Sequence, residues 1–397
     1  MTKRVIIIAA VAVVLGGCDF LHNAKKDEAQ HRWNEARSHV LLGVAMDQFK
    51  AGDLEKAEAY ASQALALDGN YVPARILMGK ILLEQAKPAD ALLELRRAEA
   101  MAPSNSEVVF LIGVALEKHT DYEEALQYYQ KARALDAVND DYVTASAEVL
   151  VKLERPQQAL DLLESRLDSH NGNASMLALA GELSMLVNDP AKAVEYFRRC
   201  NDIQPDSLQM HESLAKALFF AGQYQEAIET LTALAEDKRY QEKVSWVYVM
   251  LGDALTATGH AGLARNQYET ASRIDPDEPM IWASMAKASM LLKDDPRAIL
   301  AARQALSLSN DCVDAALVLG YVLLKGDRPG EAIELLRPVA DKHPDVPALW
   351  CTLGRCYAAQ GHTDQAVVCY RQAVKTSPED RLARYLLDAS EARARWQ

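Results

Sequence analysis

The sequence lacks the residue spacings that mark common catalytic and metal-binding sites. It has six cysteines and nine histidines, yet it contains no C-x-x-C pair and no H-E-x-x-H segment. The serine-hydrolase pattern G-x-S-x-G, the phosphate-binding glycine loop and the dinucleotide pattern G-x-G-x-x-G are absent as well. These absences argue against an enzyme. We therefore expect no catalytic residues, no metal, no cofactor and no small-molecule substrate.

Positive charge is also scarce, and it is spread along the chain. There are 43 lysines and arginines against 56 aspartates and glutamates, which gives a net charge of −13. Nucleic-acid binding needs clustered Lys and Arg side chains that neutralise phosphates. We therefore expect no nucleic acid among the partners. Glycine and proline are modest in number and form no low-complexity linker.

A short apolar run lies near the N-terminus. Lys3 and Arg4 precede an uncharged stretch over residues 5–15, which is too short to span a bilayer comfortably. The letters LGGC follow, ending at Cys18. This segment resembles a bacterial lipobox, which implies cleavage before Cys18, attachment of diacylglycerol to its thiol and usually acylation of the new amino group. Two or more acyl chains hold a protein firmly on a membrane.

The lipobox resemblance predicts where the protein is located. We expect a signal peptide over residues 1–17, lipidation of Cys18 with palmitate as a typical acyl chain, and a location on a membrane of a bacterial cell envelope. Asp19 resembles a retention signal that favours the inner membrane. The alternative is an ordinary signal peptide, or a short anchor helix with a chance cysteine.

The rest of the chain repeats itself with a step of 34 residues, which becomes 37 once. One column of equivalent positions contains only alanine, and a second column contains only glycine or alanine. The alanine column consists of Ala57, Ala91, Ala125, Ala159, Ala193, Ala227, Ala264, Ala298, Ala332 and Ala366. The small-residue column consists of Ala45, Gly79, Gly113, Ala147, Gly181, Ala215, Gly252, Ala286, Gly320 and Gly354.

The clearest repeat covers residues 347–380. Its apolar residues recur at helical spacing in two stretches joined around Gly361, and Pro378 ends the pair. We expect Gly354 and Ala366 to allow close contact between two antiparallel helices. The segment resembles the tetratricopeptide repeat family, whose pattern is matched by Trp350, Leu353, Gly354, Tyr357, Ala366, Tyr370, Ala373 and Pro378.

This resemblance implies an all-α fold: a right-handed superhelical solenoid of about ten helix-turn-helix hairpins. The hairpins would occupy residues 38–380. Before them we expect a tether and lead-in helix over residues 18–37, with Trp33 covering the first repeat. After them, residues 381–397 are expected to form a C-terminal capping helix that covers the last hairpin.

Three details stay open at this point. Cys356 and Cys369 are expected on facing helices of one hairpin, so a disulfide between them is possible. Arg166 stands where a small core residue is usual, which indicates either a partly buried, paired charge or a splayed hairpin. The three extra residues near 235–244 either bend the solenoid, offer a contact or form a tolerated surface insertion.

The family resemblance also locates a partner-binding groove, because the first helix of each hairpin lines the concave face. Exposed aromatic rings bordered by Lys and Asp suit an extended peptide or a partner helix. The alternative is that these rings pack between adjacent helices. The predicted groove residues are Lys216, Phe219, Phe220, Trp246, Asp253, Lys287, Met290 and Tyr321.

One specialised member of the family binds the acidic carboxyl tails of chaperones through a Lys-Asn-Asn-Lys-Arg set. The matching positions here hold other residues, such as Phe110, Val114 and Glu212. This clamp is therefore not supported.

We expect a non-catalytic protein–protein interaction scaffold that is anchored to the envelope through Cys18 and binds peptides or helices in its groove. Assembly of a secretion, pilus, polysaccharide-export or outer-membrane complex is the expected setting. The alternatives are an accessory subunit that presents substrates to a peptidoglycan- or glycan-processing enzyme, or a soluble cytoplasmic adaptor if the lipobox is accidental.

Overall fold

The structure is a computed structural model that describes residues 26, 28–168, 173–239 and 244–394. Cys18, Asp19 and the predicted signal peptide lie outside the described residues. Every described segment of regular structure is an α-helix, which confirms the predicted all-α class. The chain divides into two compact units, residues 1–187 and 188–397, and each is described by itself.

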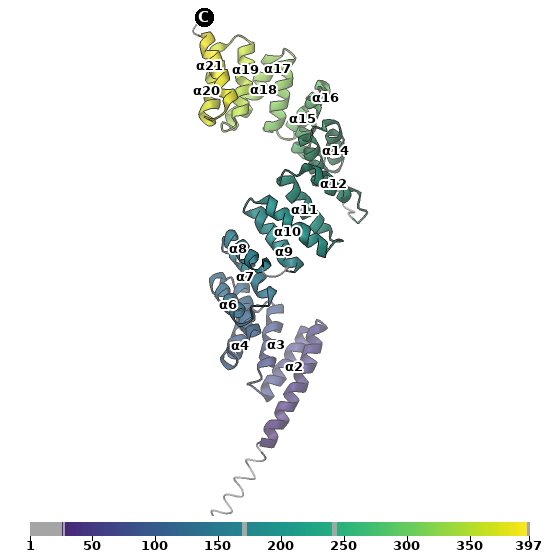
Figure 1. The fold of residues 1–397 in the computed structure, drawn as a ribbon, viewed down its shortest axis with the longest axis vertical. Helices are drawn as coiled ribbons and strands as arrows, with labels where there is room; N and C mark the ends of the chain where they lie inside the picture. Colours follow the sequence, from purple (N-terminus) through teal and green to yellow (C-terminus); the bar gives the residue numbers. More distant parts are fainter. Residues whose placement is uncertain (1–25, 27, 169–172, 240–243, 395–397) are drawn as a thin grey trace, which may run out of the picture. The chain divides into compact units, whose positions relative to one another are not determined.

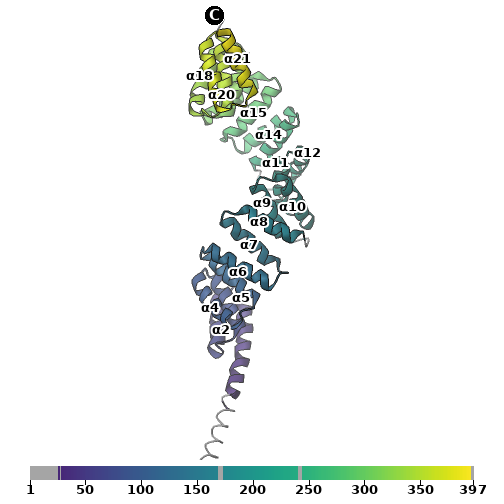
Figure 2. The same cartoon turned by 60° about the vertical axis from the view of Figure 1, so that its left-hand side comes forward.

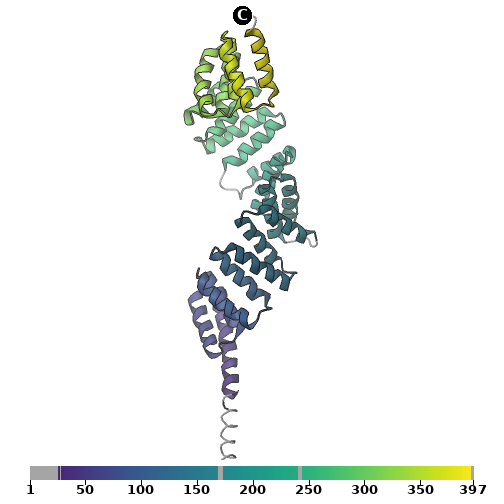
Figure 3. The same cartoon turned by 90° about the vertical axis from the view of Figure 1, so that its left-hand side faces the viewer.

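The first unit begins with one long helix over residues 28–50 (Figure 3). The expected lead-in helix and the first helix of the first repeat are therefore continuous. Trp33 on this helix is 60% exposed, so the expectation that it covers the first repeat is wrong. The helices that follow are α2 (Leu54–Leu67), α3 (Val72–Glu84), α4 (Pro88–Met101), α5 (Ser106–Lys118), α6 (Tyr122–Leu135), α7 (Asp140–Lys152), α8 (Pro156–Leu167) and α9 (Ala174–Leu186).

The second unit contains the remaining helices, which Figure 1 colours from teal to yellow. Its last helix, α21, packs against α20 (Figure 2). The helices are α10 (Pro190–Ile203), α11 (Leu208–Phe220), α12 (Tyr224–Glu236), α13 (Ser245–Ala257), α14 (Ala261–Ile274), α15 (Pro279–Leu291), α16 (Asp295–Leu308), α17 (Val313–Lys325), α18 (Pro329–Lys342), α19 (Pro347–Ala359), α20 (Thr363–Thr376) and α21 (Arg381–Ala394).

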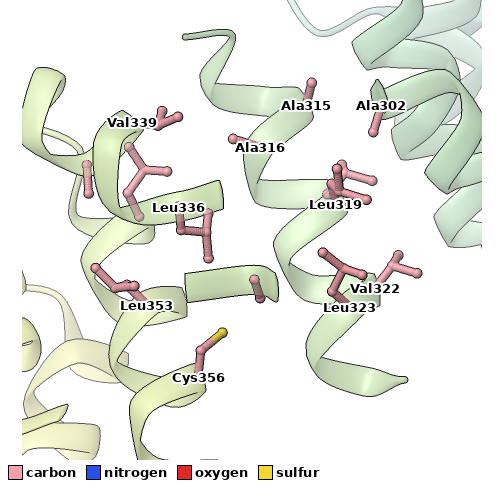
Figure 4. Close-up of a cluster of buried hydrophobic side chains, with 14 of the residues drawn as sticks. Ala302, Ala315, Ala316, Leu319, Val322, Leu323, Leu336, Val339, Leu353 and Cys356 are labelled. Carbon is pink, nitrogen blue, oxygen red and sulfur yellow. The ribbon is translucent and has the colours of Figure 1, made fainter. Parts of the chain in front are cut away.

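The core is shared between neighbouring hairpins. In the second unit, one cluster contains buried residues from three successive hairpins, among them Ala302, Leu319, Leu336 and Leu353 (Figure 4). A single hairpin cannot enclose its own apolar surface, so each one is stabilised by the next. The alanine column lies in this kind of environment throughout, because all ten of its members are fully buried.

Glycines of the small-residue column lie against large side chains of the second helix. A Cβ atom added to Gly354 would lie 2.6 Å from the ring of Tyr370, and one added to Gly252 would lie 2.5 Å from Tyr268. Gly354 therefore allows the close contact between helices that was expected, and the residue that it faces is Tyr370. The larger ring fills the space that glycine leaves open.

Each inter-helix turn has a residue with left-handed backbone at the same position of the repeat. All ten have φ between +56° and +83°, and only four are glycine. Other L-residues adopt this conformation at a cost, because Cβ crowds the following carbonyl oxygen. The ten residues are Gly52, Ala86, Thr120, Glu154, Asn188, Gly222, Gly259, Lys293, Asp327 and Gly361.

Replacing Thr120 with glycine is expected to stabilise the α5–α6 hairpin by about 1 kcal/mol, since a β-branched residue is the least suited to a φ of +71°. Hydrogen exchange of the α5 and α6 amides measures the free energy of local opening. Thr120→Ala serves as the control, because alanine keeps the Cβ atom and most of the strain. An equal effect of both substitutions would contradict this explanation.

The structure answers two of the open questions. The Arg166 Nε atom donates to Asp140 Oδ1 at 2.7 Å, and Arg166 Nη2 donates to the carbonyl of Val138 at 2.8 Å. Arg166 is thus a partly buried, paired charge. The five described cysteines are buried and none of them forms a disulfide, so Cys356 and Cys369 are not bonded to each other. Burial raises the pKa of both thiols to about 11, which disfavours the reactive thiolate.

Candidate functional site

The predicted groove residues all lie on first helices of hairpins in the second unit. The structure places three of them on α11, two on α13, two on α15 and one on α17. In chain order they are Lys216, Phe219 and Phe220, then Trp246 and Asp253, then Lys287 and Met290, and finally Tyr321.

Two adjacent phenylalanines end α11, and they have different surroundings. Phe219 is half-buried, with its ring centroid 5.6 Å from that of Tyr224 at the start of α12. Phe220 packs edge-on against Phe219 at 5.5 Å and remains 63% exposed. Phe219 is therefore mainly a packing residue, whereas Phe220 presents an apolar ring to solvent. Such a ring is available to an incoming ligand.

Lys216 and Trp246 come together from two different hairpins. The Lys216 Nζ atom lies 4.4 Å from the centroid of the half-buried Trp246 ring. A cation over an indole face is attracted by the ring quadrupole, with a gain of about 0.5–1 kcal/mol at an exposed site. This contact holds the indole beside a positive charge at the surface.

Asp253 is a half-buried acid at this site. Its Oδ1 atom accepts a hydrogen bond from the Tyr268 hydroxyl at 2.7 Å. Burial raises the pKa of Asp253, and the hydrogen bond from Tyr268 and the nearby charge of Lys287 oppose that shift only in part. Asp253 thus orients Tyr268 across the hairpin.

The remaining predicted residues also include both exposed and half-buried side chains. Lys287 is exposed, whereas Met290 is half-buried and packs against the core cluster of the second unit. Tyr321 is 41% exposed, and the guanidinium carbon of Arg355 lies 5.8 Å from its ring centroid. Arg355 belongs to α19, so a cation and a ring from neighbouring first helices meet a second time.

The first unit has a polar cluster on its own first helices. Lys152 Nζ of α7 lies 2.6 Å from Glu117 Oε1 of α5, and the buried Tyr129 hydroxyl donates to the same carboxylate. Burial, and then the charge of Glu117, raise the pKa of Glu148. These acids occupy the same helix face that defined the predicted groove. Because Glu117 already has two partners, the cluster is satisfied internally.

Three open pockets, absent from the sequence-based prediction, lie between consecutive hairpins of the second unit, on the side of the second helices. Their volumes are about 350, 330 and 350 Å³. Trp350 and Trp282 line two of them, and their Nε1 atoms donate to the carbonyls of Pro344 and Pro276 at 3.1 and 2.8 Å. Trp350, one of the residues that match the family pattern, is thus half-buried in a pocket wall and packs against the core cluster. The repeated tryptophan position was the available sequence signal.

Within the described ranges, no group of three or more His, Cys, Asp or Glu side chains lies close enough to hold a metal ion. The same part of the chain contains no helix with the length and apolar character needed to cross a membrane.

Three family models, each described as a tetratricopeptide repeat, match the chain. One matches residues 76–140 and 296–347, another residues 185–245 and 323–389, and the third residues 247–278. Together these matches span more than half of the sequence.

Individual similar proteins are distant. Tetratricopeptide repeat protein 21B of Homo sapiens is 24% identical over 328 residues, covering 79% of this chain and 23% of that protein. Protein HemY of Escherichia coli (strain K12) is 23% identical over 278 residues, covering 66% of this chain and 68% of that protein. The chain thus spans less than a quarter of the human protein's length. The solved APC/C hetero-tetramer Cut9-Hcn1 is 13% identical, with a TM-score of 0.47, covering 89% of this chain and 96% of that chain.

Proposed function

This chain belongs to the tetratricopeptide repeat family, and we propose that it is a non-catalytic scaffold that binds peptide or helical segments of partner proteins. The binding surface is formed by the first helices of the second unit, where the Phe220 ring is exposed and the rings of Trp246 and Tyr321 lie beside positive charges. Stacked hairpins supply a rigid surface of this kind without needing any chemistry at a reaction centre.

The observation that carries the proposal is the exposure of Phe220 next to the Lys216–Trp246 contact. A phenylalanine that is 63% exposed has an unfavourable hydration free energy that a ligand removes. Aromatic side chains near cations are also the residues that contribute most to binding energy at protein interfaces.

We further propose that Cys18 carries the lipid and anchors this scaffold to a membrane of a bacterial cell envelope. The support is the order of positive residues, short apolar run and LGGC in residues 1–18. Confinement to a membrane raises the local concentration of the scaffold near other membrane components. Such an arrangement suits assembly of a secretion, pilus, polysaccharide-export or outer-membrane complex.

The double variant Phe220→Ala/Trp246→Ala is expected to lose its partners. In cross-linking and affinity capture from solubilised membranes, proteins recovered with the wild-type chain should fall at least about fivefold, which corresponds to about 1 kcal/mol. Quantitative mass spectrometry provides the measurement.

The matched control is Leu263→Ala/Leu300→Ala, which removes two exposed apolar side chains from second helices of the same unit. This control should keep the wild-type set of partners. If the groove variant recovers the same proteins at the same level as wild type, the groove is not the binding surface.

A further inference from the structure

One position of the repeat forms a row along the first helices of the second unit. It directly follows the small-residue column, and its side chains share the exposed face that includes Trp246. A cation occupies every second hairpin of the row. In chain order the row contains Lys216 on α11, Asp253 on α13, Lys287 on α15, Tyr321 on α17 and Arg355 on α19.

The three cations of this row have no carboxylate within ion-pairing distance among the described residues. Lys216 and Arg355 instead lie over the rings of Trp246 and Tyr321, and Lys287 is exposed. A cation over a ring keeps N–H donors free to point toward solvent. Several other exposed cations of the unit do have acidic partners, as in the pairs Lys325–Asp295, Arg198–Glu226 and Arg371–Glu391.

The row also contains one acid, Asp253, whose charge interacts with that of Lys287. Asp253 is half-buried and accepts the Tyr268 hydroxyl hydrogen bond, so its carboxylate is engaged within its own hairpin. In a chain with thirteen more negative than positive side chains, a row with three cations and one acid is a local excess of positive charge. A surface of this sign attracts acidic ligands and repels basic ones.

We propose that Lys216, Lys287 and Arg355, with the rings of Trp246 and Tyr321, bind an extended acidic peptide segment of the partner protein. This rests on the proposed function, because it names the chemistry of the ligand at the same surface. The recognised groups are side-chain carboxylates along the segment, each of which accepts charge-assisted hydrogen bonds from one cation.

The spacing of the cations sets the spacing of the acids. Packed helices lie about 8–10 Å apart, so cations two hairpins apart are separated by roughly 20 Å along the row. An extended chain advances about 3.3 Å per residue. Acidic residues about six positions apart therefore match the row, with apolar residues between them on the two rings.

The test uses the full-length protein in detergent micelles and a fluorescein-labelled, C-terminally amidated peptide. The peptide has three glutamates spaced about six residues apart in a Gly/Ser/Ala background with one phenylalanine in each gap. Fluorescence anisotropy should show binding that weakens as salt rises. A peptide of the same composition with its three glutamates adjacent should bind at least about fivefold more weakly, because only one cation is then within reach.

The variant Lys216→Glu/Lys287→Glu/Arg355→Glu is expected to weaken binding of the spaced peptide at least about tenfold. The matched control Arg273→Glu/Arg303→Glu/Lys375→Glu makes the same charge change on exposed positions of second helices and should alter binding less than about twofold. Circular dichroism checks that both variants remain helical.

Equal weakening by both triple variants would overturn the inference, since only net charge would then matter. Binding of the spaced peptide that does not depend on the three cations would overturn it as well. If this peptide does not bind while partner capture still depends on Phe220 and Trp246, the acidic ligand is wrong and the proposed function stands. If peptide binding does not depend on the three cations and partner capture does not depend on Phe220 and Trp246, both the acidic ligand and the proposed function are wrong.

Discussion

Replacing Gly252 with alanine is expected to lower the free energy of local opening of the α13–α14 hairpin by about 3 kcal/mol. The new Cβ atom would lie 2.5 Å from the Tyr268 ring, which is far inside van der Waals contact. The ring has no room to yield, because it is almost fully buried and its hydroxyl is hydrogen-bonded to Asp253. The helices would therefore have to move apart, with loss of the packing that joins them.

The measurement is hydrogen exchange of the α13 and α14 amides, because a repeat protein of this length need not unfold in one step. Gly262→Ala is the matched control in the same hairpin. A Cβ atom at Gly262 meets nothing within 4 Å, so alanine there should stabilise α14 by about 0.5–1 kcal/mol. The same glycine-to-alanine change should thus destabilise the hairpin at Gly252 and stabilise it at Gly262, ten residues away. Equal effects would contradict the close-contact explanation.

Radioactive palmitate incorporated into the wild-type chain is expected to fall to background when Cys18 is replaced with alanine. The lipobox resemblance implies that the thiol of this residue forms the thioether to diacylglycerol and that the acyl chains follow from that step. Alanine has no sulfur atom to form the bond, so no acyl chain is attached. The wild-type chain, with two or more acyl chains, should need detergent for release from membranes.

Cys200→Ala is the matched control for the labelling experiment, since Cys200 is a fully buried cysteine. Its loss should leave the label unchanged. Label that persists in the Cys18→Ala protein, or that is absent from wild type, would end the lipoprotein proposal and leave the alternative of an ordinary signal peptide or a chance cysteine.

The fold was predictable because a repeated pattern reports the same packing many times. The alanine column alone indicated where the second helices lie. Two of these helices, α8 and α10, begin at Pro156 and Pro190, because proline is tolerated in the first turn. The residue that each glycine contacts was harder to predict. Gly354 can face either Ala366 or Tyr370 by position, and only the backbone distances distinguish them. The left-handed turn was hidden for another reason, since residues such as Thr120 and Glu154 occupy it in place of glycine.

The helix face that holds the candidate site was predictable from the sequence. The contacts among the side chains on that face were not. The repeat placed Phe219 and Phe220 together on α11, yet Tyr224 from the next helix partly buries one of them and leaves the other exposed. The ion pairs of the cations were unpredictable for the same reason. Lys325 and Lys287 look alike in the sequence, but the Lys325 ammonium is 2.7 Å from Asp295, which is distant in sequence. Ion pairing across hairpins depends on the register of neighbouring helices, which a column of residue types does not contain.

The alternation of the row has a consequence for how such a chain can lengthen. The hairpin is the unit of packing, so duplication of one hairpin would preserve the core. The row has a period of two hairpins, with Lys216, Lys287 and Arg355 at alternate positions. Duplication of a single hairpin between two of these cations would shift the phase of all that follow, whereas duplication of a pair would retain it. The smallest insertion that conserves the fold is therefore half the size of the smallest insertion that conserves the spacing of the cations.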